Sequence, residues 1–240
     1  MTKDPEKHLR RELLEALIDY KYLLNRGYKS KGALNLVTSR YLLTREERML
    51  LYRCVHSDSD VISIQGKIVN EIWGRHLIID GYNVLLTVAA AIEGLTLYLC
   101  DDGIVRDLRS AKIKDFSAPS IMNAVEIVRD ATGELGPSNV ILFLDKSVSM
   151  SAEHSKIIRM LSPQWEVILA SRTDTEVISS RGVIASSDYV ILMKAKEIYD
   201  LAGFIVLKKF PDQVVDLQRY LKQNLNNPRN QNTNGRGPVA

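Results

Sequence analysis

The chain has 240 residues, of which 45% are hydrophobic and 25% are charged, and its formal net charge at pH 7 is +3. This balance is typical of a globular protein that buries a core, and the small net charge neither requires nor excludes a nucleic-acid partner. The two cysteines, Cys54 and Cys100, favour buried thiols over a disulfide framework or a zinc site. No apolar run is long enough to cross a bilayer, so we expect a cytoplasmic protein without a membrane partner.

Residues 1–58 are predicted to form a small, basic, all-α unit. Apolar residues recur at helical spacing between positions 9 and 18, and Thr44 and Glu47 form a capping box that opens a further helix. Between residues 20 and 56 there are eight lysines or arginines and only two acids. His56, at the end of this unit, is expected at the surface.

Five tyrosines are interleaved with these basic residues, which allows two interpretations. In the first, the tyrosines stack on unpaired bases of a nucleic acid while Lys29 and Lys31, in a predicted loop, bind its phosphates. In the second, the tyrosines pack against the rest of the chain and the charges form a solvated face. Their spacing favours burial for Tyr20, Tyr41 and Tyr52.

Residues 59–223 alternate between strand-like and helix-like segments. The strand-like segments are 61–65, 76–80, 95–100, 139–145, 166–170, 182–185 and 204–208. The helix-like segments are 82–92, 120–132, 152–161, 174–180, 195–202 and 213–223. This alternation predicts an α/β domain with a mostly parallel sheet covered by helices on both faces, and 95–100 as an added edge strand. Residues 224–240, almost all polar, Gly or Pro, are expected to form a flexible tail.

Acidic residues stand at or just after five of the predicted strands: Asp80, Asp101 with Asp102, Asp145, Asp174 with Glu176, and Asp188. Each alone is more typical of a turn or a helix cap. In an open parallel sheet, however, the carboxyl ends of the strands meet at the edge where ligands bind, and several carboxylates there repel one another unless a cation is bound. Mg²⁺ or Mn²⁺ is therefore the expected cofactor, and metal-assisted phosphodiester hydrolysis is the expected chemistry.

Four motifs in residues 76–208 resemble, in the same order, those of the PIN-like nucleases, especially their NYN branch: Ile79-Asp-Gly-Tyr-Asn83, Leu142-Phe-Leu-Asp145, Thr173-Asp-Thr-Glu176 and Ala185-Ser-Ser-Asp-Tyr189. The resemblance implies a PIN-like, Rossmann-like three-layer fold. It also implies metal binding and catalysis by four aspartates, supported by two further side chains: Asp80, Asp145, Asp174 and Asp188, with Asn83 and Ser187. The order Asp174-Thr-Glu176 departs from the family pattern, which leaves open which of these two acids faces the metal.

The acidic segment 101–107 is not a usual PIN element. In one interpretation it reaches the site, where Asp102 supports the metal ligands and Arg106 binds a substrate phosphate. In the other it is a hairpin loop in which Arg106 pairs with Asp102 or Asp107. The whole chain is also similar to a mainly archaeal family catalogued as domain of unknown function 434, through the segments Tyr22-Leu-Leu-Asn-Arg-Gly-Tyr28 and Arg40-Tyr-Leu-Leu-Thr-Arg-Glu-Glu-Arg48. That similarity implies no activity.

Three functional hypotheses follow from these patterns. The first is a metal-dependent nuclease whose preferred partner is RNA, guided to the site by the basic helical unit. The second is a PIN-like scaffold that binds RNA or protein without catalysis, which the irregular order at Asp174 favours. The third is a hydrolase of small phosphoesters that uses the same acids. The sequence leaves open whether the chain forms a homo-oligomer.

Overall fold

The computed structural model describes residues 1–108 and 119–225, and most of the predicted flexible tail, residues 226–240, lies outside them. None of the helices in these ranges is both long enough and apolar enough to cross a membrane. The helices are α1 (Pro5–His8), α2 (Arg11–Asn25), α3 (Ser30–Arg40), α4 (Arg45–Cys54), α5 (Asp58–Gln65), α6 (Gly81–Ile92), α7 (Pro119–Leu135), α8 (Ser151–Leu161), α9 (Thr173–Ser179), α10 (Tyr189–Lys194), α11 (Leu201–Lys209), the 3-10 helix η1 (Pro211–Gln213) and α12 (Leu217–Leu225). The strands are β1 (His76–Asp80), β2 (Leu97–Leu99), β3 (Val105–Arg106), β4 (Asn139–Asp145), β5 (Glu166–Ala170), β6 (Val183–Ala185) and β7 (Val214–Asp216).

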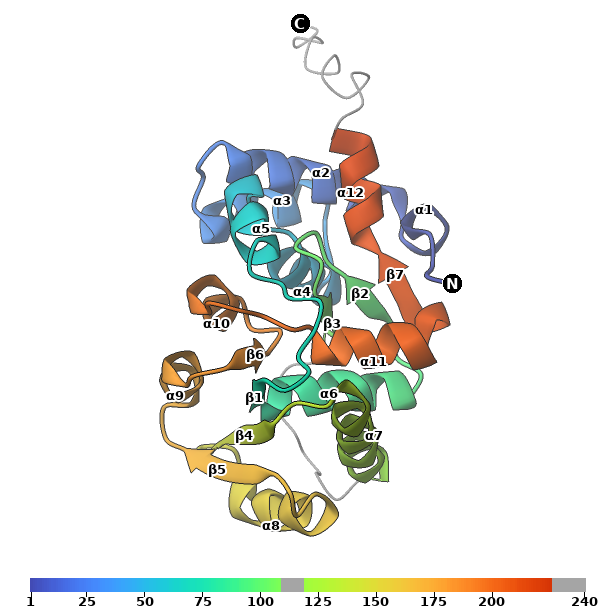
Figure 1. Ribbon diagram of the computed structural model, residues 1–240. Helices are drawn as coiled ribbons and strands as arrows, with labels where there is room; N and C mark the ends of the chain where they lie inside the picture. The colour runs from blue at the N-terminus through green and yellow to red at the C-terminus, as the bar shows by residue number, and fades with distance from the viewer. Residues whose placement is uncertain (109–118, 226–240) are drawn as a thin grey trace, which may run out of the picture.

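A four-stranded parallel sheet in the order β5-β4-β1-β6 forms the centre of the α/β part (Figure 1). Its side chains alternate between two cores, as the pleat of a strand requires. Leu77 and Ile79 pack with residues of α6, α7 and α11 on one face. Ile78 packs on the other face with residues of α9 and α10, and with Ile64 of α5. The prediction of a mixed α/β fold with a parallel sheet between helical layers is therefore confirmed.

The order of the strands reverses at β1. The chain passes from β1 to β4 and β5 on one side, and then crosses to β6 on the other side of β1. In open α/β sheets, a ligand crevice forms outside the carboxyl ends of the strands at such a reversal. The fold therefore directs attention to the ends of β1 and β6.

A second, smaller sheet has the order β3-β2-β7. β2 pairs antiparallel with β3 and parallel with β7. The segment 95–100 was expected as an edge strand of the main sheet, and this expectation is wrong because β2 is the central strand of the separate sheet. The helix predicted over 213–223 begins only at Leu217, after β7.

Three further segments differ from their prediction. Residues 61–65, read as a strand, lie in α5, where Ser57 caps the helix by accepting from the Asp60 amide. Residues 204–208, also read as a strand, lie inside α11, and the predicted helix 195–202 overlaps it only at its start. The short helix α10 was not predicted. Short apolar runs fit a strand and a buried helix equally well, which explains these errors.

The N-terminal helices have a core of their own that continues into the second sheet. Leu17 of α2 and Leu51 of α4 are fully buried in one cluster with Cys100, Val215 and Leu221. Figure 1 shows the consequence: α12, near the end of the described chain, lies beside α2. The all-α unit is thus packed on residues from the C-terminal part of the chain.

The tyrosines of the helical unit do not share one environment. Tyr20 is fully buried and Tyr41 half-buried, in keeping with their prediction, whereas 57% of Tyr52 is exposed, so its predicted burial is wrong. Both cysteines are free and buried, as expected from their apolar neighbours. An exposed tyrosine on α4 leaves an aromatic ring available for contact with a partner.

Candidate active site

Four aspartates stand at the carboxyl edge of the main sheet, one after each strand. Asp80 ends β1, Asp145 ends β4, Asp174 lies in the first turn of α9 after β5, and Asp188 precedes α10 after β6. They are close enough to affect one another: the charges of Asp188 and Asp174 act on Asp80, and those of Asp188 and Asp145 act on Asp174. The four acids selected from the sequence therefore share one edge of one sheet.

Asp80 is the buried member of this group, with 5% of its surface exposed. Its Oδ2 accepts hydrogen bonds of 2.7 Å from Asn83 Nδ2 and 2.7 Å from Ser186 Oγ. Burial raises the pKa of Asp80 to about 6; these two bonds act against the rise, and the charges of Asp188 and Asp174 add to it. The two hydrogen bonds thus fix the orientation of the Asp80 carboxylate, but they do not offset the cost of burying its negative charge.

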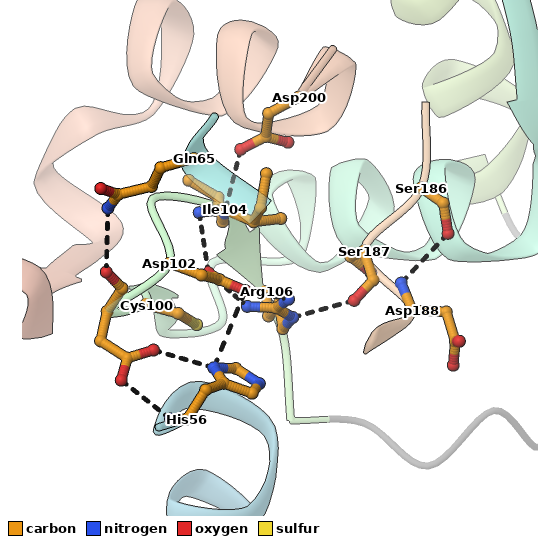
Figure 2. A network of polar contacts seen from close by, with 12 residues as sticks. His56, Gln65, Cys100, Asp102, Ile104, Arg106, Ser186, Ser187, Asp188 and Asp200 are labelled. Carbon is orange, nitrogen blue, oxygen red and sulfur yellow. Dashed lines mark hydrogen bonds and ion pairs between the residues drawn. The ribbon is translucent and has the colours of Figure 1, made fainter. Parts of the chain in front are cut away.

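Three consecutive residues after β6 organise the site. Ser186 Oγ donates to Asp80 and accepts from the Asp188 amide at 3.0 Å, a bond drawn in Figure 2. Ser187 Oγ donates to Asn83 Oδ1 at 3.4 Å. Asn83 thus contacts Asp80 directly, and Ser187 contacts Asn83. Ser186 was missed. Because Ile79 pairs with Ala185, the next residues of the two strands are Asp80 and Ser186, so the pairing of β1 with β6 is the signal that would have identified it.

Asp145 and Asp188 also have the ordinary roles of strand-end acids. Asp145 Oδ1 accepts from the Ser147 amide at 2.7 Å, and Asp188 Oδ1 caps α10 by accepting from the amides of Val190 and Ile191 at 2.8 and 3.1 Å. The interpretation of these acids as turn and cap residues is therefore correct for Oδ1 of Asp145 and Oδ1 of Asp188. Within the described ranges the second oxygen, Oδ2, of both side chains has no hydrogen-bond donor and can serve as a ligand.

The structure distinguishes Asp174 from Glu176. Glu176 Oε1 lies 3.4 Å from the amide of Arg172 at the start of its own helix. Asp174, in contrast, is exposed, and desolvation followed by the charges of Asp188 and Asp145 raises its pKa. Asp174 is therefore the acid of this pair that takes part in the electrostatics of the sheet edge.

The sheet edge carries negative charge without a paired cation. In the part of the chain that the structure describes, none of the four aspartates has a lysine, arginine or histidine nitrogen within 4.0 Å. In the same residues, no three of their carboxylates bring oxygens within 4.8 Å of one another. The group is thus looser than a closed protein cage. Mg²⁺ commonly binds through one or two carboxylates and takes its other ligands from water and phosphate, so this donor set fits such an ion.

A second acidic group, next to the first, is already neutralised by protein cations. His56, Asp101 and Asp102 place ligand atoms within 4.8 Å of one another. However, Lys21 Nζ lies 2.9 Å from Asp101, and Arg106 binds Asp102 through two bonds of 2.8 and 2.6 Å (Figure 2). With one cation for each carboxylate, this group has the composition of a structural ion-pair network.

Of the two interpretations of segment 101–107, the structure agrees with the hairpin in which Arg106 pairs with Asp102. The guanidinium is 1% exposed, binds Asp102, and donates through Nε to the carbonyl of Ser187 at 2.9 Å. Burial alone would raise the pKa of Asp102, but the charge and bonds of Arg106 outweigh it and hold that pKa below its usual value. His56 is 6% exposed, so its expected surface position is wrong. Arg106 thus ties the second sheet to the segment that organises Asp80.

Lys29 and Lys31 lie at the start of α3 and are exposed. They stand on either side of Ser30, whose hydroxyl lies 2.7 Å from the Tyr20 hydroxyl. Lys29 is the residue that precedes the helix and Lys31 lies in its first turn, so only Lys29 has the predicted loop conformation. Their charges are available to a partner that approaches this end of the helical unit.

Comparison with known proteins identifies relatives without an assigned activity. Residues 69–204 match the family described as "Domain of unknown function (DUF5616)", and residues 12–67 match "Protein of unknown function (DUF434)". A protein of Methanocaldococcus jannaschii, "Uncharacterized protein MJ0935", is 35% identical over 184 residues, which cover 72% of this chain and 86% of that relative. No solved structure matches the chain. The expected similarity to family 434 is thus confirmed for the helical part, and a different family model covers the α/β part.

Proposed function

The chain belongs to the family described as "Domain of unknown function (DUF5616)", and from its acidic sheet edge we propose that it is a metal-dependent nuclease that cleaves RNA. The observation that carries the proposal is electrostatic. Each acid of the neighbouring network is paired with a lysine or arginine, whereas the four aspartates at the ends of adjacent parallel strands are not paired with any cation in the described residues. A divalent ion is the partner that such a group of oxygens selects.

The fold supports a PIN-like assignment as part of this proposal. A parallel sheet lies between two helical layers, and each of its four strands ends in or is followed by one of the motifs that contain Asp80, Asp145, Asp174 and Asp188. Asp80 and Asp188 flank the reversal of strand order, which is where a ligand crevice is expected. The order of the acids and their position in the fold therefore both agree with the resemblance to the NYN branch.

The residues of the site have distinct parts in the proposed mechanism. A bound Mg²⁺ or Mn²⁺ lowers the pKa of a water molecule and stabilises charge on the leaving oxygen of the phosphodiester. Asn83 and Ser186 bind one oxygen of Asp80 and fix its orientation, so that the other oxygen would be free to hold the ion. The α10 cap holds Asp188 in the same way. Asp145 and Asp174 supply further negative charge that favours the divalent ion.

The decisive experiment compares strand-end acids of the two sheets. Single-stranded RNA is incubated with Mn²⁺ and with the wild-type chain, Asp80→Asn, Asp145→Asn or Asp216→Asn. Asp216 is a matched control, because it ends β7 of the second sheet and accepts from the Arg219 amide at 2.9 Å. A metal ion contributes several kcal/mol to such a reaction and each 1.4 kcal/mol is tenfold in rate, so we expect the first two variants to lose at least about 100-fold in rate.

The outcome separates the three hypotheses. Cleavage by the wild type and by Asp216→Asn, lost in the other two variants and in EDTA, supports the nuclease. RNA that is bound but left intact by a wild-type chain with Mn²⁺ indicates the scaffold, for which the spacing of the carboxylates is the supporting observation. Hydrolysis of bis(p-nitrophenyl) phosphate without cleavage of RNA indicates the small-phosphoester hydrolase.

A further inference from the structure

A cavity of about 540 Å³ lies between the helical unit and the start of α10, directly beside the acidic edge. Three residues of the candidate site, Asn83, Ser187 and Asp188, form part of its wall. Its volume falls in the range of pockets that enclose a small molecule or a single nucleotide unit. A group held in this cavity would therefore be a neighbour of whatever is bound at Asp188.

The opposite part of the wall is aromatic. Tyr20 comes from α2, Tyr52 from α4 and Tyr189 from α10. The ring of His56 is stacked on that of Tyr189, with centroids 5.0 Å apart and planes 8° from parallel. Tyr52 is 57% and Tyr189 38% exposed, so rings of both elements are accessible to a flat occupant. Flat, uncharged rings are the groups that such walls bind best.

His56, a residue of this wall, has one nitrogen without a partner in the described part of the chain. His56 is 6% exposed, and its Nδ1 lies 2.8 Å from Asp101 Oδ1. Its Nε2 is buried and has no hydrogen-bond partner among the described residues. In Figure 2 this nitrogen lies on the side of the ring that faces away from Asp101. A buried polar atom without a partner costs free energy, and the described residues leave this cost uncompensated.

We propose that this cavity binds an unpaired base of single-stranded RNA, next to the phosphate that is held at the acidic edge. The position of the phosphate rests on the nuclease function proposed above. A base carries no charge, so Asp188 and Asp60 in the wall do not repel it, and its polar edge can bond to the Asn83 and Ser187 side chains that line the cavity. The helical unit therefore contributes the base-binding half of the substrate site.

The test measures RNA binding without catalysis. A fluorescein-labelled single-stranded RNA decamer of mixed sequence is titrated with each chain in EDTA, and fluorescence anisotropy gives the affinity. Tyr52→Ala and Tyr189→Ala should each bind at least about fivefold more weakly, the loss expected when one stacked base is released. Tyr189→Phe, which keeps the ring, should bind like the wild type.

The matched control is Tyr22→Ala. Tyr22 lies on α2, is 50% exposed and packs under Arg26, but it does not line the cavity. We expect it to leave RNA affinity unchanged. Wild-type chain that does not bind the decamer, unchanged affinity in both cavity variants, or an equal loss in Tyr22→Ala would each overturn the proposal. Tyr52→Ala is the safer of the two cavity variants for folding, because its ring is already half in solvent.

Failure of this proposal and failure of the nuclease give different results. If the cavity variants bind RNA as the wild type does while cleavage persists, the cavity assignment is wrong and the nuclease stands. If the cavity variants lose affinity while the wild type with Mn²⁺ leaves RNA intact, the base site stands and the nuclease is wrong. Asp145→Asn, which does not line the cavity, should lose cleavage and keep its RNA affinity.

Discussion

Three aspartates of this chain are stabilised in different ways. Asp102 forms an ion pair with the guanidinium of Arg106, and its pKa is low. Asp200 is desolvated, which raises its pKa to about 6, and its carboxylate caps the amides of Val105 and Gly203. Asp80 is also desolvated and also accepts from two neutral donors, but the charges of Asp188 and Asp174 raise its pKa further. Its ionisation therefore costs the fold free energy that a bound cation would return.

This cost predicts that Asp80 makes stability depend on pH. Its pKa rises from 3.8 in the unfolded chain to about 6 in the folded chain, so the folded state binds the proton more tightly. The stability that the folded chain gains from the protonated Asp80 is fully present below pH 4 and is lost as the pH rises through about 6. A difference of about 2 pKa units corresponds to roughly 3 kcal/mol. In EDTA at pH 8, Asp80→Asn should thus be more stable than the wild type by up to about 3 kcal/mol.

Urea unfolding of both chains at pH 4 and pH 8 measures this difference. At pH 4 the Asp80 carboxyl is protonated in the folded chain and only about half ionised in the unfolded chain, so the two chains should agree within about 1 kcal/mol, which serves as the internal control. At pH 8, Mn²⁺ should raise the urea midpoint of the wild type and not that of Asp80→Asn. An Asp80→Asn chain less stable than the wild type at pH 8 without metal would contradict the electrostatic account of this site.

At this scale the sequence predicts the acids better than their partners. Asp80, Asp145, Asp174 and Asp188 lie in recognisable motifs at strand ends, which are local features. Ser186 acquires its role from the pairing of β1 with β6, and the His56 ring acquires its stacked position from the packing of α10 on the helical unit. Such contacts join residues distant in sequence, so no local pattern reveals them.

Among the elements, the start of α6 is packed tightly against β4. Gly81 directly follows Asp80, and a Cβ there would lie 2.8 Å from Leu142 Cδ2 and 2.8 Å from the carbonyl oxygen of Phe143. The backbone of α6 thus approaches β4 as closely as a glycine permits. This approach sets the direction in which β1 ends, and with it the position of the Asp80 carboxylate.

Gly81→Ala should therefore destabilise the chain by about 1–3 kcal/mol, the usual cost of forcing a methyl group into a packed interior. Gly133→Ala in α7 is the matched control, since its Cβ would meet nothing within 4 Å. There the alanine should stabilise the helix by up to about 1 kcal/mol. Thermal unfolding measures both changes, and a neutral Gly81→Ala would show that α6 can move away from β4.

The elements that the sequence predicts well are those with long patterns or clear caps. The capping box of Thr44 and Glu47 is present as predicted, and β1, β4 and β5 have the predicted bounds. Errors are concentrated in short apolar runs. The run at 204–208 forms part of α11 because it packs on α6 and α7, and this tertiary contact determines its conformation.

At the scale of the whole molecule, the helical unit and the α/β part share ionic and apolar contacts. α2 packs on α12, and the core of the helical unit includes side chains of β7. The buried Lys21 of α2 places its Nζ 2.9 Å from Asp101, in the turn between β2 and β3. Sequence patterns indicate the two parts, but they do not show the contacts that join them. These contacts, here called the joint, depend on the return of the C-terminal β7 and α12 to the N-terminal helices.

The joint predicts that the two parts unfold together. Tryptophan fluorescence reports only on the α/β part, since Trp73 and Trp165 both lie there, whereas far-UV circular dichroism reports on all helices. The urea transitions seen by the two probes should coincide.

Lys21→Met leaves Asp101 buried without its lysine, and should lower the free energy of unfolding by about 3 kcal/mol in a single step. Arg11→Met, which removes an ion pair with 88% of the Arg11 side chain exposed, should cost less than about 0.5 kcal/mol. Two separate transitions would show instead that the helical unit folds independently, and that the cavity between the two parts can open.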